Sequence, residues 1–398
     1  MQMVDSLAAR DTTGVLSKHK IQRRECRSND VYINVLFCGI CHSDLHQIRA
    51  EWSIPHYYPM VPGHEIVGVV EKVGKDVSKF KIGEKVGVGV FVDSCRSCSS
   101  CKRGEENYCL GCEGKEDRMC GTYNCCLKDN NNEILYGGYS ASITVDENYV
   151  FRIPDNLPLD KAAPLLCAGI TMFSPLNFFG CLEHGAGMQV GIQGFGGLGH
   201  MGVKLAVAMG CAVTVLSRSA SKAGEAEALG AKFLLSSDAD QMAKHENHFD
   251  LIISTISGDY AISNFFSLLK VAGKYCLVGL PPNGIHFPTA FDLVVGRKSL
   301  VGSCIGGIRE TQAMLDFCSD HNIAADIELI SAKDVNHAMV DLAANRSMAR
   351  RYVIDIAKTL NDETPVEGDD RIDPRDWKVH EKATIIPKEA NAHANLQK

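Results

Sequence analysis

Four residues of types that bind zinc stand at three separated places in the chain: Cys41, the adjacent pair His64 and Glu65, and Cys167. Thiolate, imidazole and carboxylate groups are the usual protein ligands of zinc, and a catalytic site keeps one coordination position for water or substrate. Zinc with an open position acts as a Lewis acid. The set therefore predicts an enzyme with a catalytic zinc site.

A second group of four cysteines is closely spaced, in the pattern C-x2-C-x2-C-x7-C. Its members are Cys95, Cys98, Cys101 and Cys109. Four thiolates fill a tetrahedral zinc shell and leave no position open, which is typical of a structural site. Cys112 forms a C-x2-C pair with Cys109 and is the alternative fourth ligand. We expect two zinc ions per chain.

Composition excludes several classes of protein. The 398 residues are 45% hydrophobic and 22% charged, which is ordinary for a globular protein of two domains. The net charge of -7 argues against a nucleic-acid partner. No apolar run is long enough for a membrane helix, and the first residues do not resemble an export signal. We therefore expect a cytoplasmic protein that binds neither nucleic acid nor membrane.

The seventeen cysteines are an odd number, and a disulfide framework accounts for them poorly in a chain without an export signal. Metal ligation and buried thiols account for them better. Seven cysteines outside the zinc groups are expected to be small buried hydrophobic residues. These are Cys26, Cys38, Cys181, Cys211, Cys276, Cys304 and Cys318.

The predicted pattern of secondary structure changes near residue 168. Residues 1–167 contain short β-rich runs such as 31–36 and 66–70, which predict a mostly antiparallel β domain with a zinc lobe at about 93–112. Apolar strands then alternate with helical segments over 168–304, and this predicts a parallel doubly wound sheet in an α/β domain. The six expected strands are 189–193, 211–216, 232–235, 249–255, 274–280 and 299–303.

The remainder of the chain has two parts. Residues 305–357 are expected to return to the first domain as a helix and two or three strands, so the second domain would be an insertion. Residues 358–398 are polar and poor in apolar side chains, which predicts an extended or partly disordered tail. Docking of this tail through Trp377, Ile385 and Ile386 is the alternative.

A dinucleotide motif stands between the strand at 189–193 and a helical run at 200–209. It comprises Gly194, Gly196, Gly197, Leu198 and Gly199. In such motifs the glycines allow a tight turn, close approach of the pyrophosphate, and packing of helix on strand. A carboxylate at the end of the next strand would select NAD, but this chain has Ser217, Arg218 and Ser219 there, with Lys222 following. Hydroxyls and cations suit a 2'-phosphate, so we predict NADP(H).

Taken in order, these motifs resemble the zinc-dependent medium-chain dehydrogenases/reductases, and among them the cinnamyl alcohol dehydrogenase type. The similarity extends from about residue 8 to 357. It rests on the segments 41–46, 63–65, 166–171, 194–202 and 296–298 and on the four-cysteine run. The resemblance implies a GroES-like catalytic domain with an inserted Rossmann domain, and hydride transfer between a nicotinamide and an alcohol or aldehyde.

The resemblance also assigns roles. It implies that Cys41, His64 and Cys167 bind the catalytic zinc, with Glu65 as an occasional fourth ligand. Ser43 resembles the hydroxyl that passes a proton to the reacting oxygen, and His46 the far end of that relay. Asp44 resembles the carboxylate that orients His64, and Thr171 a residue that flanks the nicotinamide.

The substrate pocket is expected to be lined by Trp52, Ile54, Cys304 and Ile305. The sequence departs from the family at Gly121 and Thr122, where many plant members carry a large aromatic residue, so we expect an open pocket that accepts aromatic and medium-chain aldehydes. The resemblance further implies a homodimer formed by the Rossmann domains, with the strand near 298–303 continuing across the two-fold axis.

The leading interpretation is an NADP(H)-dependent zinc alcohol dehydrogenase that interconverts primary alcohols and aldehydes, mainly as an aldehyde reductase. One alternative keeps the fold and cofactor but reduces an activated C=C or C=N bond, and would be expected to lack the zinc ligands or Ser43. Another is a non-catalytic zinc-binding interaction protein, which leaves the dinucleotide motif without a use.

Overall fold

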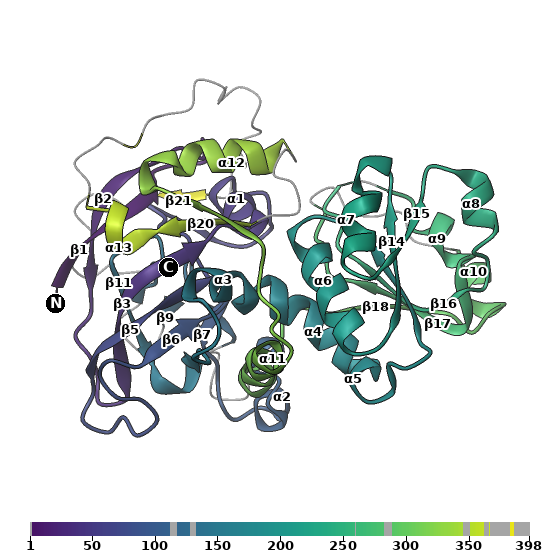
Figure 1. Cartoon of the computed structure of the whole chain (residues 1–398). Coiled ribbons are helices and arrows are strands. Elements are labelled where there is room, and N and C mark those ends of the chain that lie inside the picture. Colours follow the sequence, from purple (N-terminus) through teal and green to yellow (C-terminus); the bar gives the residue numbers. More distant parts are fainter. Residues whose placement is uncertain are drawn as a thin grey trace. The chain divides into compact units, whose positions relative to one another are not determined.

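The computed structural model describes residues 2–111, 118–127, 133–258, 260–281, 289–344, 351–361, 366 and 383–385. Contacts along the chain divide it into two compact units (Figure 1). The first consists of Met1–Cys167 and Gly307–Lys398, and the second of Ala168–Gly306. The second unit is thus inserted into the first. The chain re-enters the first unit at Gly307, two residues after the predicted return at residue 305.

The first unit is built on a seven-stranded sheet with β3 (Asp30–Gly39) at its centre. The strand order is β12-β6-β5-β3-β20-β19, and β11 pairs with the other part of β3. The remaining members are β5 (Ile66–Val73), β6 (Lys85–Val88), β11 (Ser142–Asp146), β12 (Phe151–Arg152), β19 (Ile327–Ile330) and β20 (Arg351–Asp355). All pairings are antiparallel except β19 with β20. The predicted antiparallel β texture is confirmed.

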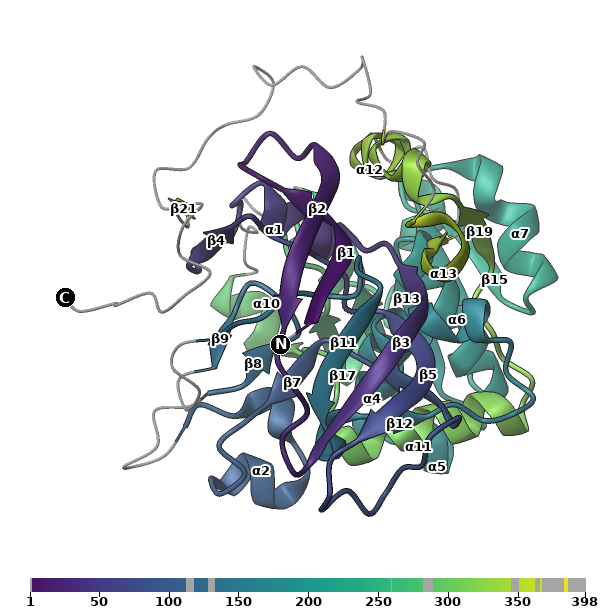
Figure 2. The ribbon, with the colours of Figure 1, turned by 90° about the vertical axis from the view of Figure 1, so that its left-hand side faces the viewer.

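Shorter elements complete this unit. β1 (Gln2–Ala9) and β2 (Leu16–Arg23) form an antiparallel hairpin (Figure 2). The other strands before residue 167 are β4 (His56–Tyr58), β7 (Phe91–Asp93), β8 (Cys120–Gly121), β9 (Cys126–Leu127) and β10 (Glu133–Ile134). The α-helices there are α1 (His42–Ile48), α2 (Ser99–Arg103) and α3 (Leu159–Ala162). β7 pairs with β8 and β9 with β10.

The second unit contains a six-stranded parallel sheet in the order β15-β14-β13-β16-β17-β18. Its strands are β13 (Gln189–Gln193), β14 (Ala212–Ser217), β15 (Lys232–Leu235), β16 (Phe249–Ser254), β17 (Leu269–Leu277) and β18 (Ser299–Gly302). Its helices are α4 (Ala168–Phe178), α5 (Cys181–His184), α6 (Gly197–Ala208), α7 (Ala223–Ala228), α8 (Ala239–Ala243), α9 (Ser263–Phe266) and α10 (Ala290–Val294). The order reverses at β13, as in doubly wound dinucleotide-binding domains. The predicted α/β class and the six strands are confirmed, with boundaries shifted by a few residues.

The segment after Gly307 adds α11 (Ile308–Asp320), α12 (Val335–Ala343) and α13 (Ile356–Thr359) to the first unit, besides β19 and β20. Of the tail, the structure describes only residues 358–361, 366 and the short strand β21 (Ala383–Ile385), which pairs with β4. Trp377 and Ile386 lie outside the described residues. Among the helices described, none combines the length and apolar character needed to cross a bilayer.

Candidate zinc and cofactor sites

The four residues predicted for catalytic zinc meet in the first unit. Cys41 is the N-cap of α1, His64 and Glu65 precede β5, and Cys167 follows a 3-10 helix at Ala163–Leu166. Their ligand atoms all lie within 4.8 Å of one another, and all four residues are buried. Cys167 Sγ lies 3.8 Å from Cys41 Sγ and 3.3 Å from His64 Nε2. The fold therefore converges two sulfurs and one ring nitrogen on one buried point.

Asp44 organises this convergence. Its carboxylate accepts hydrogen bonds from the backbone N–H of Cys41 at 2.9 Å and of Gly63 at 3.0 Å. His64 Nδ1 lies 3.1 Å from Asp44 Oδ1, so the other ring nitrogen, Nε2, is directed at the sulfurs. Burial by itself would lower the pKa of His64, but the Asp44 carboxylate raises it well above its usual value. Asp44 thus fixes the ring orientation that a metal ligand requires.

Glu65 lies in the same site and is fully buried. Gly39 leaves space for it, because a Cβ at Gly39 would lie 2.0 Å from Glu65 Oε2. Burial raises the pKa of Glu65 to about 8, and the nearby Arg351 guanidinium, 3.3 Å from Oε1, opposes this rise. Among the described residues neither carboxylate oxygen has a hydrogen-bond partner. Unsatisfied oxygens beside two thiols and an imidazole fit a divalent cation.

The structural set also assembles. The sulfurs of Cys95, Cys98, Cys101 and Cys109 form a second group within 4.8 Å. Backbone N–H groups point at these sulfurs, from Cys95 to Cys109 Sγ at 3.3 Å and from Cys98 to Cys95 Sγ at 3.3 Å. Desolvation opposes ionisation of Cys95, but N–H groups of Ser97 and Cys98 lower its pKa to about 5. These contacts favour a thiolate at Cys95, and four sulfurs brought together at this spacing fit a closed zinc site. Cys112 lies outside the described residues.

The glycine motif lies between β13 and α6 in the second unit. Gly194 has φ of 91°, which only glycine adopts readily, and a Cβ at Gly199 would lie 2.0 Å from the carbonyl oxygen of Gly194. A Cβ at Gly196 would meet nothing within 4 Å, so the loop is open on that side. Gly197 and Leu198 form the first turn of α6. An open backbone before a helix N-terminus fits a pyrophosphate.

The residues predicted to select NADP(H) follow β14. Ser217 ends the strand, and Arg218 and Ser219 are exposed. Lys222 Nζ donates to the carbonyl oxygen of Phe195 at 2.8 Å, which joins this segment to the glycine loop. Desolvation lowers the pKa of Lys222. Hydroxyls and cations thus lie together beside the loop, where an NAD-specific site would place a carboxylate.

Two family descriptions match the chain: the alcohol dehydrogenase GroES-like domain over residues 27–155 and the zinc-binding dehydrogenase over residues 197–320. The chain is 49% identical to probable cinnamyl alcohol dehydrogenase 9 of Arabidopsis thaliana, over 89% of this chain and 95% of that protein. The chain belongs to the zinc-dependent medium-chain dehydrogenases of the cinnamyl alcohol dehydrogenase type.

Solved structures agree with this membership. A cinnamyl alcohol dehydrogenase from Sorghum bicolor has a TM-score of 0.86 and 44% identity, and the match covers 91% of this chain and all of that one. The Helicobacter pylori enzyme complexed with NADP(H) has a TM-score of 0.82 and 42% identity, covering 90% of this chain and 99% of that one. This dehydrogenase is accordingly an oxidoreductase of alcohols and aldehydes that uses zinc and NADP(H).

The two predicted relay residues lie on α1 of the dehydrogenase. Ser43 is half-buried in its first turn, and His46 follows three residues later on the same side. His46 Nδ1 pairs with the Glu51 carboxylate, and its ring lies 5.4 Å from the ring of Trp52. Glu51 was not predicted.

Other predicted residues occupy varied surroundings. Trp52 is half-buried and Ile54 is exposed, both before β4. Thr171 is buried in α4 and Ile305 is buried after β18, whereas Cys304 is exposed. The prediction of Cys304 as a buried thiol was wrong, because its side chain is exposed two residues after strand β18 ends at Gly302.

An aromatic ring that the sequence did not reveal lies against the catalytic set. Tyr123 is buried, and its ring stacks on the ring of His64 with centroids 5.9 Å apart. Its hydroxyl accepts a hydrogen bond from Gln47 Nε2 at 3.0 Å. Tyr123 directly follows Gly121 and Thr122, where many plant members carry a large aromatic residue, and this closeness in sequence is the signal that could have revealed it.

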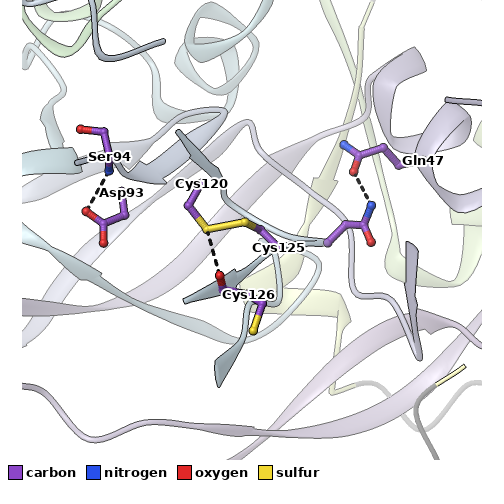
Figure 3. The surroundings of a disulfide bond; sticks show 7 residues. Gln47, Asp93, Ser94, Cys120, Cys125 and Cys126 are labelled. Carbon is purple, nitrogen blue, oxygen red and sulfur yellow. Dashed lines mark hydrogen bonds between the residues drawn. A yellow bond between two sulfur atoms is a disulfide. The ribbon is translucent and has the colours of Figure 1, made fainter. Parts of the chain in front are cut away.

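Cysteine pairing also differs from the expectation of metal ligands and buried thiols alone. Cys120 and Cys125 form a disulfide, with Cα atoms 6.0 Å apart (Figure 3). A sequence separation of 5 gave little reason to predict it. Cys26 is half-buried, while Cys38, Cys181, Cys211, Cys276 and Cys318 are buried as predicted.

The Glu65–Arg351 pair gives a stability prediction. At a pH above 8, where Glu65 is ionised in the metal-free enzyme, Arg351→Met leaves this buried carboxylate without its cation, so the free energy of unfolding of the metal-free enzyme should fall by about 3–5 kcal/mol. Adding Glu65→Gln should restore most of the loss. The check is a double-mutant cycle by urea denaturation, with the exposed Arg309→Met changing stability by less than about 0.5 kcal/mol. A double variant no better than the single would refute the coupling.

The segment after β14 gives a cofactor prediction. Arg218→Ala should raise KM for NADPH by about 10- to 100-fold, because a charged hydrogen bond to phosphate contributes roughly 1.5–3 kcal/mol. KM for NADH, which lacks the phosphate, should hardly change. Steady-state kinetics with both cofactors measures this, with the exposed Lys244→Ala as control. Equal losses for NADPH and NADH would show that Arg218 does not recognise the phosphate.

Proposed function

We propose that this dehydrogenase works mainly as an NADPH-dependent aldehyde reductase with aromatic, cinnamyl-like and medium-chain aldehydes as its substrate class. The observation that carries the proposal is the buried convergence of Cys41, His64 and Cys167 beside a carboxylate with unsatisfied oxygens. Relatives named as cinnamyl alcohol dehydrogenases, and 8-hydroxygeraniol dehydrogenase of Catharanthus roseus at 49% identity, support an alcohol or aldehyde of this kind.

Separate groups of residues would hold the two zinc ions and the cofactor. Cys41, His64 and Cys167 would hold the catalytic zinc, which when bound supplies a Lewis acid for the carbonyl or alcohol oxygen. NADPH bound along the glycine loop supplies the hydride. Glu65, which pairs with Arg351, would be available as a further ligand of this zinc. Cys95, Cys98, Cys101 and Cys109 would hold the structural zinc.

Two residues of α1, Ser43 and His46, would transfer the proton that the reaction requires. The Ser43 hydroxyl, close in sequence to Cys41, is proposed to give a proton to the alkoxide formed from the aldehyde. His46, which pairs with Glu51, would resupply that proton. Retention of the zinc ligands and of Ser43 favours carbonyl reduction over reduction of a C=C or C=N bond.

The pocket assignment of Trp52, Ile54, Cys304 and Ile305 remains part of this proposal, as do Thr171 beside the nicotinamide and a cytoplasmic location. Two sets of zinc-binding thiols suit a reducing compartment, in which cysteines stay available as ligands. Gly121, in place of a bulky side chain, supports acceptance of both bulky and small aldehydes.

The function is tested by initial rates with NADPH and NADH, using cinnamaldehyde and a small aliphatic aldehyde, before and after treatment with a chelator. We expect NADPH-dependent turnover of both aldehydes, two zinc ions per chain, and loss of activity in step with loss of the zinc held by Cys41, His64 and Cys167. Ser43→Ala should keep both zinc ions but lose about 100-fold or more in kcat. No turnover of any aldehyde by fully zinc-loaded protein would reject the proposal in favour of another double bond.

A homodimer through the second unit is also proposed. β18 is an edge strand of the six-stranded sheet, with unpaired backbone groups able to continue the sheet. Three apolar side chains after or within α10 are highly exposed: Phe291 at 74%, Val294 at 77% and Val295 at 68%. Apolar exposure of this extent beside an edge strand is typical of an interface.

Val294→Asp should convert the dimer to a monomer or weaken it strongly, because two buried carboxylates would face each other near a two-fold axis. Size-exclusion chromatography with light scattering over a concentration series measures the change. Phe178→Asp, at an equally exposed site in α4, should leave the dimer intact. A monomeric wild-type protein at all concentrations would reject the interface.

A further inference from the structure

A short covalent ring adjoins the catalytic ligand set. The Cys120–Cys125 disulfide closes residues 120–125 into a loop between β8 and β9 (Figure 3). Both cysteines lie outside the two groups of zinc ligands. Cys120 is buried and pairs through β8 with Asp93 of β7, while Cys125 is half-buried. One end of the ring is thus fixed in a strand, and the other is reachable from solvent.

The ring presents Tyr123 to the zinc-ligand set. The Tyr123 ring is 3% exposed and stacks on the His64 imidazole at an interplanar angle of 23°. Its hydroxyl accepts a hydrogen bond from the side chain of Gln47 in α1, the helix that begins after Cys41. Tyr123 therefore contacts one ligand directly and touches the helix that carries another.

Asn124 ties the same ring to neighbouring segments. Its backbone has φ of 51°, and its side chain donates to Gln47 Oε1 at 2.9 Å and to the carbonyl oxygen of Pro55 at 3.2 Å. Its amide oxygen accepts from the N–H of Tyr57 at 2.9 Å. Asn124 occupies a left-handed conformation that asparagine tolerates but does not prefer. Closure of the ring restricts the other conformations open to this residue.

We propose that Cys120 and Cys125 form a reversible thiol–disulfide switch that controls how firmly Tyr123 supports His64, and so sets the turnover rate of the dehydrogenase. This inference rests on the proposed aldehyde reductase activity. Tyr123 acts as a positioning residue, through its contact with a zinc ligand. In the oxidised enzyme the ring holds Tyr123 and Asn124 on α1; in the reduced enzyme the loop samples conformations in which those contacts are broken.

The exchange balances with a low-molecular-weight disulfide such as oxidised glutathione. The more accessible Cys125, as thiolate, attacks one glutathione sulfur, forms a mixed disulfide and releases one reduced glutathione. The Cys120 thiolate then attacks Cys125 Sγ, closes the ring and releases the second. Two protons and two electrons leave the protein pair and reduce the glutathione disulfide, and reduced glutathione reverses the steps. Disulfides of cytosolic proteins are usually of this transient, redox-responsive kind.

The test equilibrates the zinc-loaded enzyme in glutathione buffers of different ratio and follows three quantities. Mass spectrometry of alkylated peptides reports the Cys120–Cys125 state, hydrogen exchange reports mobility of residues 118–127, and steady-state kinetics reports kcat and KM. We expect kcat to change by about tenfold between the two states in step with the peptide signal, since small displacements near a reacting centre are costly. Zinc content should stay at two per chain.

Two variants make the result specific. Cys125→Ser should show the reduced enzyme's kcat and hydrogen exchange in every buffer, whereas Cys26→Ser, a half-buried cysteine outside both zinc groups, should respond like wild type. A wild-type pair that stays reduced in every buffer, or oxidation that leaves kcat and exchange unchanged, overturns the switch. So does a redox response that persists in Cys125→Ser.

Failure of the proposed function would look different. If no aldehyde is turned over, the peptide masses and hydrogen exchange still report whether ring closure orders residues 118–127. Redox-dependent ordering without turnover would reject the aldehyde substrate and the control of its turnover rate. It would leave intact the inference that the disulfide orders residues 118–127. Turnover without redox dependence would reject the switch alone.

Discussion

The catalytic half of the molecule depends on one buried carboxylate. Asp44 is fully buried and receives the N–H of Cys41, the N–H of Gly63, His64 Nδ1 and, at 3.3 Å, the hydroxyl of Tyr139. A buried anion is costly unless its lone pairs are satisfied, and here four donors from three segments of the chain satisfy them. The carboxylate has all its hydrogen bonds only when α1 and the segment before β5 are correctly placed against each other. Its need for hydrogen bonds therefore fixes the relative positions of the two metal ligands Cys41 and His64.

The ligand set itself has the opposite character, because its groups are destabilised without a cation. Cys41 and Cys167 lie 3.8 Å apart, and a hydrogen bond from the Cys167 thiol lowers the pKa of Cys41 while the proton is retained on Cys167. Glu65 adds a third acidic group, offset by Arg351. A divalent cation would neutralise the negative charge of the ligand groups that Asp44 holds in position. Folding therefore preorganises the site, and metal binding releases the proton that the sulfurs share.

Sequence patterns disclosed the parts of this arrangement whose chemistry is carried by residue type and local spacing. Cysteine and histidine at metal-ligand spacing, and glycines between a strand and a helix, rarely occur together without a metal or a nucleotide to bind, so both zinc sets and the nucleotide loop could be predicted. Arg351 and Tyr123 could not, since an arginine or tyrosine has many roles and its partner lies far away in the chain. Glu51 beside His46, and the Cys120–Cys125 pair, are local in sequence, yet nothing in residue type distinguishes them from surface carboxylates and thiols. The tail beyond residue 361 was predicted from composition alone and lies almost wholly outside the described residues.

The structural and catalytic zinc sites are connected by a short path of the chain as well as by lying in the same unit. The cysteine lobe begins directly after β7, and the chain emerges from it at Met119, whose N–H donates to the carbonyl oxygen of Cys109 at 3.0 Å. β8 then pairs back onto β7 and delivers Tyr123 to the ring of His64. Among the described residues of this lobe, the buried cluster consists of Cys95, Cys101 and Cys109 themselves, so a closed tetrahedral metal site is the element that can hold this path in place. The structural zinc would thus anchor the loop that lies against the catalytic ligands, and changes within that loop act at the reaction centre without altering the ligands themselves.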